Sequence, residues 1–254
     1  MSTVSTIVTD DVLSLLEAAD LPEGFSPRVV VGEISAANAD VATVKFQRPD
    51  STTGLGRMSV HEFAGPRRWV VGNSYTMLQL DPGPRPFFST ADDRLVAAVL
   101  DGVSPEVRSG KVRVMGVARR AGARTKIAVA ATVDGIDPVA ACVGRAHNRV
   151  DAIRAALGGE QVDVVAWHPD RGVFLSNALQ PAQCVFVWTD PNRPVALAVA
   201  PDHQMSAAVG GAGLNSALAG RLVGVALRVV PESAASEIDV IAQAMAAAQA
   251  TTAQ

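Results

Sequence analysis

The order of predicted helices and strands occurs twice in the second half of the chain, and this repeat limits the possible folds more than any other feature. Residues 90–167 predict a helix, two strands, two helices and a strand from their apolar periodicity and their glycine and proline positions. Residues 172–230 predict the same six elements in the same order. Since two copies are too few for a solenoid, the repeat indicates two small α+β domains in tandem.

The two copies have similar predicted boundaries. In the first copy, Thr90-Ala-Asp-Asp93 matches a capping box that begins a helix ending at Gly102. The other elements of the first copy are strands at 111–118 and 125–132, helices at 138–143 and 148–157, and a strand at 162–167. The elements of the second copy are a helix at 172–179, strands at 184–189 and 194–200, helices at 203–209 and 214–222, and a strand at 225–230.

Short strand-like runs precede the repeat. RVVVGEIS, VATVKFQR and WVVGNSYTMLQL lie between residues 28 and 80 and are separated by Asn, Asp, Gly and Pro. Such a series predicts a small five-stranded barrel of the oligonucleotide-binding type, with part of a larger sheet as the alternative. The apolar spacing also predicts a short helix at 10–20 and an Ala-rich amphipathic helix at 236–250.

The residue content argues against several classes of protein. Cys142 and Cys184 form no CxxC pair, which argues against a disulfide scaffold or a Cys-rich zinc site and fits a reducing cytoplasm. The four histidines have no companion at a metal-ligand spacing. No export signal or membrane span is apparent. Because no nucleophile, paired carboxylate or metal cluster stands out, we expect a protein that is not an enzyme and has no metal or cofactor.

Charge is distributed unevenly along the chain. The net charge of −3 and the 4% aromatic content argue mildly against a nucleic-acid binder. Residues 110–233, however, contain 13 Lys and Arg against 9 Asp and Glu, whereas residues 1–109 contain 9 against 14. Most of the basic excess lies in KVRVMGVARRAGARTK at 111–126, which has no acidic residue. This run indicates where an anionic partner would bind, and a solvated basic face of two strands is the alternative.

In both copies glycine stands between the two inner helices, at Gly144 in the first and within residues 210–213 in the second. Glycine reaches positive φ at low cost and lets another backbone approach closely, and the following helix offers unpaired N–H groups. This arrangement is typical of a phosphate clamp, and a KH module uses a GxxG loop of this kind to hold about four nucleotides. A helix–helix turn closed by glycine is the alternative.

Longer stretches resemble a known family. VARRAGARTKIAVA at 117–130 and GIDPVAACVGRAHNRVDAIRAALGGEQVDVVAW at 135–167 resemble the first KH domain of the NusA family of bacterial transcription factors. FLSNALQPA at 174–182 and LAVAPDHQMSAAVGGAGLNSALAGRLVG at 197–224 are similar to the second KH domain. The region upstream resembles, more loosely, the S1 domain of that family.

The resemblance implies an α+β multidomain protein, in which an S1-like β-barrel of the OB type precedes two type II KH domains. The domain boundaries that it implies are a helical lead-in at 1–24, the barrel at 25–89, the first KH domain at 90–170, the second at 171–232, and a helical tail at 233–254.

The sequence departs from the family pattern at three places. We expect the large N-terminal domain through which the family contacts RNA polymerase to be missing or replaced by the predicted helix at 10–20, so the resemblance does not extend to that contact. The first loop reads GRAH at 144–147, so His147 stands where the family pattern GxxG has its second glycine. Because histidine is enriched at positive φ, we expect the turn to persist, and we expect phosphate binding there to be weaker. Gly211 stands where the family usually has lysine, which removes a phosphate contact.

Eleven residues are predicted RNA contacts. Three match a basic phrase of the family on the predicted hairpin, and the others lie at or beside the two glycine joints. For Arg149 a helix cap or a salt bridge is the alternative, and for Asn215 a hydrogen bond to the loop itself. The full set is Arg119, Arg124, Lys126, Gly144, Arg145, Arg149, Gly210, Gly211, Ala212, Gly213 and Asn215.

The resemblance therefore implies a cytoplasmic regulator of transcription elongation, termination or antitermination that binds single-stranded RNA through tandem KH domains. RNA polymerase and other transcription factors are the candidate protein partners. The alternative is a protein-interaction scaffold, in which the eroded loops no longer bind RNA and the S1–KH frame docks on a partner protein.

Overall fold

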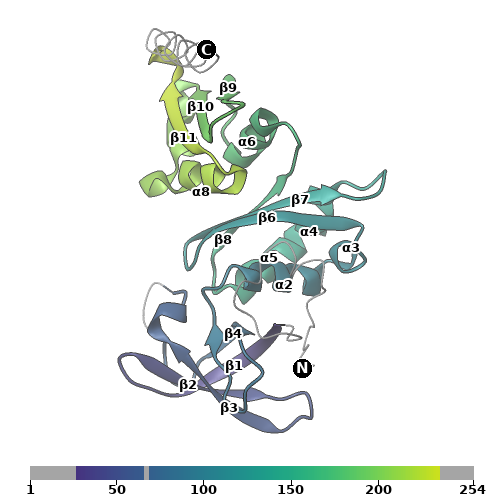
Figure 1. Cartoon of the computed structure of the whole chain (residues 1–254), viewed down its shortest axis with the longest axis vertical. Helices are drawn as coiled ribbons and strands as arrows, with labels where there is room; N and C mark the ends of the chain where they lie inside the picture. Colours follow the sequence, from purple (N-terminus) through teal and green to yellow (C-terminus); the bar gives the residue numbers. More distant parts are fainter. Residues whose placement is uncertain (1–26, 66–68, 235–254) are drawn as a thin grey trace. The chain divides into compact units, whose positions relative to one another are not determined.

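A computed structural model describes residues 27–65 and 69–234 of the chain (Figure 1). The chain divides into two compact units, residues 1–167 and residues 168–254. The helices predicted at 10–20 and 236–250 lie outside the described residues. Within the described ranges, no helix is both long and apolar enough to cross a lipid bilayer.

The first unit begins with a curled five-stranded sheet in the order β3-β2-β1-β4-β5. Its strands are β1 (Arg28–Ala37), β2 (Val41–Gln47), β3 (Thr53–Ser59), β4 (Ser74–Gln79) and β5 (Phe88–Ser89). Neighbouring strands are antiparallel. An isolated parallel bridge joins Arg57 of β3 to Phe87, and the Arg57 N–H donates to the carbonyl oxygen of Pro86 at 2.9 Å. The sheet therefore curls until β3 meets the residue before β5, and this curled sheet is called the barrel below.

The alternating pattern of β2 and β3 directs every second residue into the barrel. Phe46 and Phe88 lie edge to face there, with ring centroids 4.9 Å apart. A Cβ on Gly56 would lie 2.4 Å from a ring carbon of Phe88, so β3 needs glycine at this position. The buried residues of the barrel core are Val30, Ile34, Ala42, Val44, Phe46, Met58, Trp69, Met77 and Phe88.

Three sequence predictions for this region need correction. β3 was not predicted because its glycines disfavour strand structure, although the phenylalanine rings require small residues there. The strand predicted from residue 69 begins only at Ser74. The predicted capping box is wrong: the helix begins at Arg94, and the Thr90 hydroxyl accepts a hydrogen bond from the Ala64 N–H at 2.6 Å instead of capping it.

The first unit continues with the first copy of the predicted repeat, which contains one additional short helix. Its helices are α2 (Arg94–Val103), α3 (Pro105–Arg108), α4 (Pro138–Val143) and α5 (Asn148–Ala156), with a 3-10 turn η2 (Arg145–His147) between the last two. Its strands are β6 (Val112–Arg120), β7 (Arg124–Ala131) and β8 (Gln161–Ala166), in the order β6-β7-β8. β7 pairs antiparallel with β6 and parallel with β8. The additional helix is α3, which the sequence did not predict.

One hydrophobic core joins the barrel to this domain. Val29 of β1 and Leu78 of β4 are buried in the same cluster as the apolar face of α2 and the inward residues of β6, β7 and β8. The barrel and the first α+β domain therefore share one hydrophobic core.

Within the first α+β domain, Asp137 caps α4 by accepting hydrogen bonds from the N–H groups of Val139 and Ala140.

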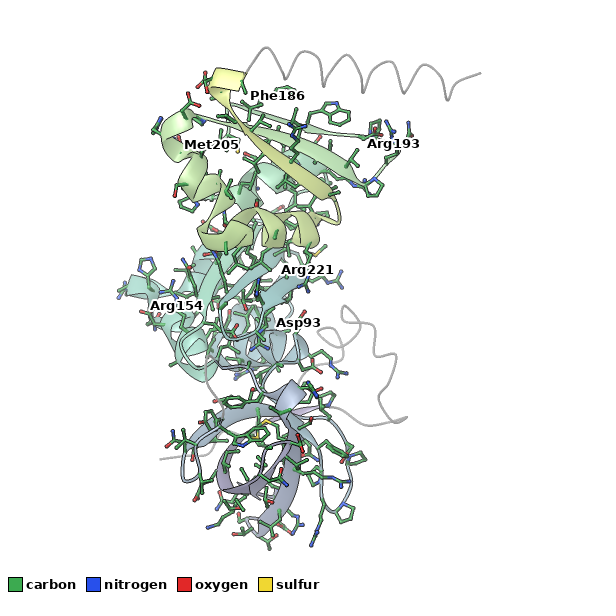
Figure 2. All side chains as sticks on the ribbon, turned by 90° about the vertical axis from the view of Figure 1, so that its left-hand side faces the viewer. Asp93, Arg154, Phe186, Arg193, Met205 and Arg221 are labelled. Carbon is green, nitrogen blue, oxygen red and sulfur yellow. The ribbon has the colours of Figure 1, made fainter. Side chains whose placement is uncertain are left out.

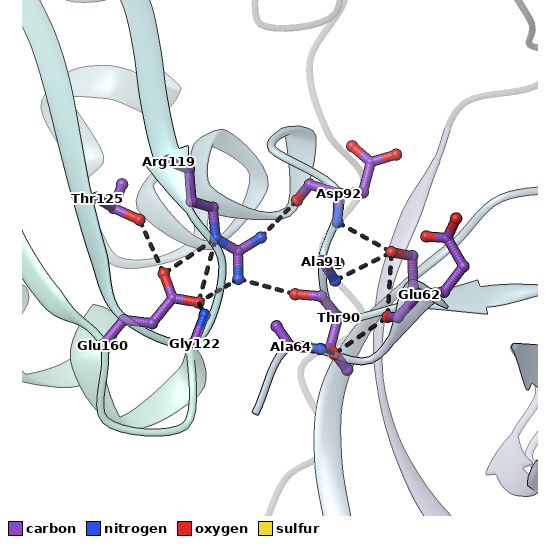
Figure 3. Close-up of polar contacts among 10 residues, drawn as sticks. Glu62, Ala64, Thr90, Ala91, Asp92, Arg119, Gly122, Thr125 and Glu160 are labelled. Atoms are coloured by element: carbon purple, nitrogen blue, oxygen red, sulfur yellow. Dashed lines mark hydrogen bonds and ion pairs between the residues drawn. The ribbon is translucent and has the colours of Figure 1, made fainter. Parts of the chain in front are cut away.

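A buried ion pair reinforces this junction (Figure 3). Arg119 Nη2 lies 2.6 Å from Glu160 Oε1, and the two side chains are 1% and 0% exposed. The guanidinium also donates to the carbonyl oxygens of Thr90 and Asp92, both at 2.8 Å. The N–H of Thr90 in turn donates to the carbonyl oxygen of Glu62 in the barrel region at 2.8 Å. A continuous series of hydrogen bonds thus links the β6–β7 hairpin to the barrel.

The hairpin turn also approaches the barrel backbone closely. Gly122 has φ +78°, and a Cβ there would lie 3.1 Å from the backbone nitrogen of Gly65. The Gly122 N–H donates to Glu160 Oε1 at 2.7 Å. Glycine at this turn therefore allows both the positive φ and the close contact.

The second unit contains the second copy of the repeat. Its helices are α6 (Arg171–Leu179), α7 (Met205–Val209) and α8 (Leu214–Val223), with 3-10 turns η3 (Asp202–Gln204), η4 (Gly211–Gly213) and η5 (Glu232–Ala234). Its strands are β9 (Phe186–Thr189), β10 (Val195–Ala200) and β11 (Ala226–Pro231), in the order β11-β10-β9. β10 pairs parallel with β11 and antiparallel with β9, as in the first copy. Phe186, at the start of β9, is about half exposed (Figure 2).

The first prediction concerns the buried ion pair. Glu160→Gln leaves the Arg119 charge buried without its counterion, and we expect the free energy of unfolding of the first unit to fall by about 3–5 kcal/mol. Urea unfolding followed by circular dichroism measures this loss. Asp151→Asn is the matched control, because it breaks an ion pair with Arg154, which is labelled in Figure 2. The Asp151 and Arg154 side chains are 59% and 42% exposed, so this change should cost less than about 1 kcal/mol. Equal losses in the two variants would contradict the account.

The second prediction concerns Asp101 of α2, which is 1% exposed and whose carboxylate oxygens have no hydrogen-bond partner among the described residues. Burial raises the pKa of this carboxyl, and Arg108 only partly opposes the shift. A raised pKa means that the ionised form destabilises the fold above that pKa. We expect Asp101→Asn to stabilise the protein by about 1 kcal/mol at neutral pH, and the gain to shrink as the pH falls toward about 4. Thermal unfolding at both pH values tests this, and a less stable variant at neutral pH would overturn it.

Candidate nucleic-acid interface

Each α+β domain has a tight loop between its two inner helices. In the first domain, α4 ends at Val143 with Gly144 as its C-cap, and residues 145–147 lead directly into α5. Gly144 has φ 77° and ψ 169°, Ala146 has φ 49° and ψ 36°, and His147 has φ 65° and ψ 11°. Three of the four loop residues therefore have positive φ, although only one of them is glycine.

The loop of the second domain has nearly the same backbone. Gly210 has φ 75° and ψ 167°, Ala212 has φ 52° and ψ 29°, and Gly213 has φ 74° and ψ 11°. His147 thus adopts the left-handed conformation that Gly213 adopts at the equivalent position. The expected persistence of the first turn is confirmed, and the histidine in it is exposed.

The glycine that opens each loop is required by close packing. A Cβ on Gly144 would lie 2.3 Å from Asn148 Oδ1, and a Cβ on Gly210 would lie 2.7 Å from the Asn215 Cβ. In contrast, a Cβ on Gly211 or Gly213 would meet no atom within 4 Å. The outer side of the second loop is therefore open.

Arg149 and Asn215 hold these loops in place from equivalent positions. Arg149 Nη1 donates to the carbonyl oxygen of Ala141 in α4 and pairs with Glu106 Oε2 at 2.6 Å. Asn215 Nδ2 donates to the carbonyl oxygens of Leu179, Ala207 and Ala208 at 3.0–3.1 Å. Both side chains bind backbone carbonyls of the helix that precedes the loop. The salt bridge that was the alternative for Arg149 is present in the structure. The hydrogen bonds that Asn215 Nδ2 donates go to α6 and α7 and not to the loop residues 210–213.

The two loops present different charges. Arg145 is exposed in the first loop and forms no ion pair within the described part of the chain. Residues 210–213 consist of glycine and alanine and carry no side-chain charge. The first loop can therefore offer a guanidinium to an anion, whereas the second can offer only backbone N–H groups and the N-terminus of α8.

Arg119 was predicted to contact RNA, but in this structure its guanidinium is buried against Glu160. The physical reason is a β-bulge between Val114 and Gly116 of β6. Before the bulge, Val112 and Val114 face the helices, whereas after it Arg119 pairs with Thr125 and shares the inward face. The bulge shifts the alternation by one residue and turns Arg119 toward the core.

Arg124 and Lys126 are also paired within the protein. Asp163 Oδ2 lies 2.6 Å from Arg124 Nη2 and 2.9 Å from Lys126 Nζ. Burial lowers the pKa of Lys126, although Asp163 opposes the shift. The structure therefore does not bring Arg124 and Lys126 to the glycine loops as free cations.

Three other basic residues of the 111–126 run are exposed instead. Lys111, Arg113 and Arg120 form no ion pair within the ranges that the structure describes. The sequence contained a signal that Arg113 is exposed. It alternates with Val112 and Val114, and because these apolar neighbours face the core, the arginine between them faces solvent. These residues were not among the predicted contacts.

The described residues contain no group of three or more His, Cys, Asp or Glu side chains that could hold a metal ion. Burial raises the pKa of Cys142 to about 12, so its thiol is not a nucleophile at neutral pH. The groups that the described loops present to solvent are therefore backbone N–H groups and, in the first loop, the side chain of Arg145.

Comparison with known proteins identifies both domains. A model of the NusA-like first KH domain matches residues 90–167, and a model of the NusA-like second KH domain matches residues 172–237. The paired loops lie inside these two matches.

Relatives named transcription termination/antitermination protein NusA match the same region. The protein of Halalkalibacterium halodurans is 36% identical over 159 residues, which are 63% of this chain and 42% of the relative. That of Mycobacterium tuberculosis is 41% identical over 121 residues, 47% of this chain and 35% of the relative. That of Rickettsia prowazekii is 29% identical over 222 residues, 86% of this chain and 42% of the relative.

The chain thus spans about two fifths of the length of the curated relatives it matches. The Rickettsia alignment is too long to fit within residues 90–254, so it extends into the region of the curled sheet. The chain therefore contains two NusA-like KH domains in tandem, at residues 90–167 and 172–237.

Proposed function

We propose that this protein is an RNA-binding regulator of transcription termination and antitermination, and that it grips single-stranded RNA with the two glycine loops. The observation that carries the proposal is the shared backbone of the loops at 144–147 and 210–213 in two NusA-like KH domains. That backbone is the same although one loop contains histidine and the other contains glycine at the same position.

The loop geometry explains how RNA would bind. The phosphates would approach the open side of each loop, where no described side chain caps α5 or α8 and the helix dipole favours negative charge. In the first loop Arg145 would add a charge-assisted contact, and in the second the missing side chains at Gly211 and Gly213 would let the RNA backbone approach. Gly144, Gly210 and Ala212 would shape the loops, while Arg149 and Asn215 would position them.

We also propose that the curled sheet is an S1-like barrel of the OB type, which occupies about residues 25–89 and precedes KH domains at about 90–170 and 171–232. The meeting of β3 with the strand region of β5 supports this proposal, since a partly open five-stranded barrel is typical of that fold. Its shared core with the first KH domain would make the barrel and that domain a single platform.

The remaining features of the proposal follow from the same relationship. RNA polymerase and other transcription factors would be the protein partners, the cytoplasm would be the location, and no reaction would be catalysed. A protein-interaction scaffold is the second candidate, and the observation that favours it is the absence of any side-chain charge in the second loop.

The third prediction restores a charge to the second loop. Gly211→Lys fits without strain, because φ at this residue is not in the left-handed region and its Cβ would meet no atom within 4 Å. We expect single-stranded RNA to bind about three- to tenfold more tightly at low salt, and the logarithmic salt dependence to steepen by about 0.7, the value for one added phosphate contact. Fluorescence anisotropy across a salt series measures both. Gly211→Ala is the control and should change neither quantity, and an unchanged affinity in the lysine variant would count against RNA at this loop.

The fourth prediction concerns an obstruction of the same loop. Gly213→Asp places a carboxylate where phosphate would pass, at a residue with φ +74°, and should weaken RNA binding at least about tenfold. Gly224→Asp is the matched control, because Gly224 also has φ +74° and open space around its Cβ but lies at the other end of α8. Equal loss in the two variants would assign the effect to backbone strain, and no loss in Gly213→Asp would favour the scaffold.

A further inference from the structure

The first loop is held by an ion pair that the second loop lacks. Glu106 of α3 accepts from Arg149 Nη1 at 2.6 Å and from the Ser104 hydroxyl at 3.2 Å. The same Arg149 nitrogen and the same hydroxyl also donate to the carbonyl oxygen of Ala141. Four groups from α3, α4, α5 and the residue before α3 therefore meet at a single point.

This network lies directly beneath the loop. Ala141 belongs to the last turn of α4, and Arg149 belongs to the first turn of α5. The Cγ of Arg149 packs so closely against Gly144 that a Cβ on the glycine would be 2.6 Å from it. Movement of the Arg149 side chain would therefore release the contact that fixes the first residue of the loop.

In the second domain an uncharged side chain takes the place of the ion pair beneath the loop. There Asn215 binds three carbonyl oxygens, one of them at the end of α6, and it is fully buried. α6 leads to β9 without an intervening helix, so no counterpart of α3 is present within the described residues of this unit. The residue that binds the helix carbonyls pairs with a carboxylate in the first domain, where it is an arginine, and binds only carbonyl oxygens in the second, where it is an asparagine.

We propose that Glu106 is a positioning residue for the first RNA-binding loop, which acts through Arg149 and does not touch RNA. This inference rests on the proposed function of that loop. The pKa of Glu106 is held below its usual range by its own backbone N–H and by Arg149, so the carboxylate is ionised at neutral pH. The Arg149 and Glu106 side chains are about one quarter and one third exposed, so loss of the pair should not unfold the domain.

The sign of the effect separates positioning from general electrostatics. Removal of an acidic residue near a phosphate-binding loop strengthens RNA binding if only the net charge matters. If Glu106 positions the loop, its removal weakens binding, because Arg149 loses the partner that orients it. A substitution that neutralises Glu106 therefore has opposite expected results under the two explanations.

The experiment compares Glu106→Gln with Asp151→Asn in the full chain, by fluorescence anisotropy with a labelled single-stranded RNA. Both variants remove one negative charge from the first KH domain, but Asp151 pairs with Arg154 on the surface of α5. We expect Glu106→Gln to bind RNA about three- to tenfold more weakly, with an unchanged thermal unfolding profile, and Asp151→Asn to bind equally or more tightly.

A double-mutant cycle provides the second readout. In an Arg149→Met background the carboxylate has no arginine to orient, so Glu106→Gln should have no further effect on RNA affinity. The positioning role would be overturned if Glu106→Gln bound RNA as tightly as the wild-type protein or more tightly, or if the effects of the two substitutions were additive. In either case RNA binding by the wild-type protein would leave the proposed function intact. Absence of RNA binding by the wild-type protein would instead reject the proposed function, and the positioning role with it.

Discussion

The buried pair of Arg119 and Glu160 is the constraint on which the first unit depends. A guanidinium and a carboxylate with almost no solvent contact are stable only if every polar atom is matched, and here the carbonyls of Thr90 and Asp92, the Gly122 N–H and the Thr125 hydroxyl complete the set. The pair joins the end of the hairpin to the segment that leaves the barrel. Arg119, one of the three basic residues that match the family phrase, thus stabilises this junction and is not available to RNA.

The two loops have nearly the same backbone conformation, although different residues and different supporting contacts hold it in each domain. Both begin with a glycine that no other residue could replace without a clash, and both end in the left-handed region, once with histidine and once with glycine. Left-handed φ costs a residue with a Cβ about 1 kcal/mol, which the packing beneath the first loop must offset. The ion pair of Arg149 and Glu106 supplies that packing in the first domain, and the amide of Asn215 supplies it in the second.

Local signals predicted most of the fold, and long-range contacts account for what they missed. α4 begins and ends as predicted because Asp137, Pro138 and Gly144 mark its ends. β3 was missed because its glycines are required by rings elsewhere in the barrel, and Arg119 was misassigned because a bulge cannot be recognised from alternation alone. The loops were predicted from glycine spacing, whereas Glu106 was not, since it lies 43 residues from the arginine it holds.

A nuclear magnetic resonance titration of the ¹⁵N-labelled protein with a short single-stranded RNA tests directly whether the two loops bind RNA. If both loops bind the RNA, the largest amide shifts should fall on residues 144–149 and 210–216. The interior of the barrel and the residues around Glu160 should stay unchanged. Binding that left both loops unshifted and moved amides elsewhere would contradict the account.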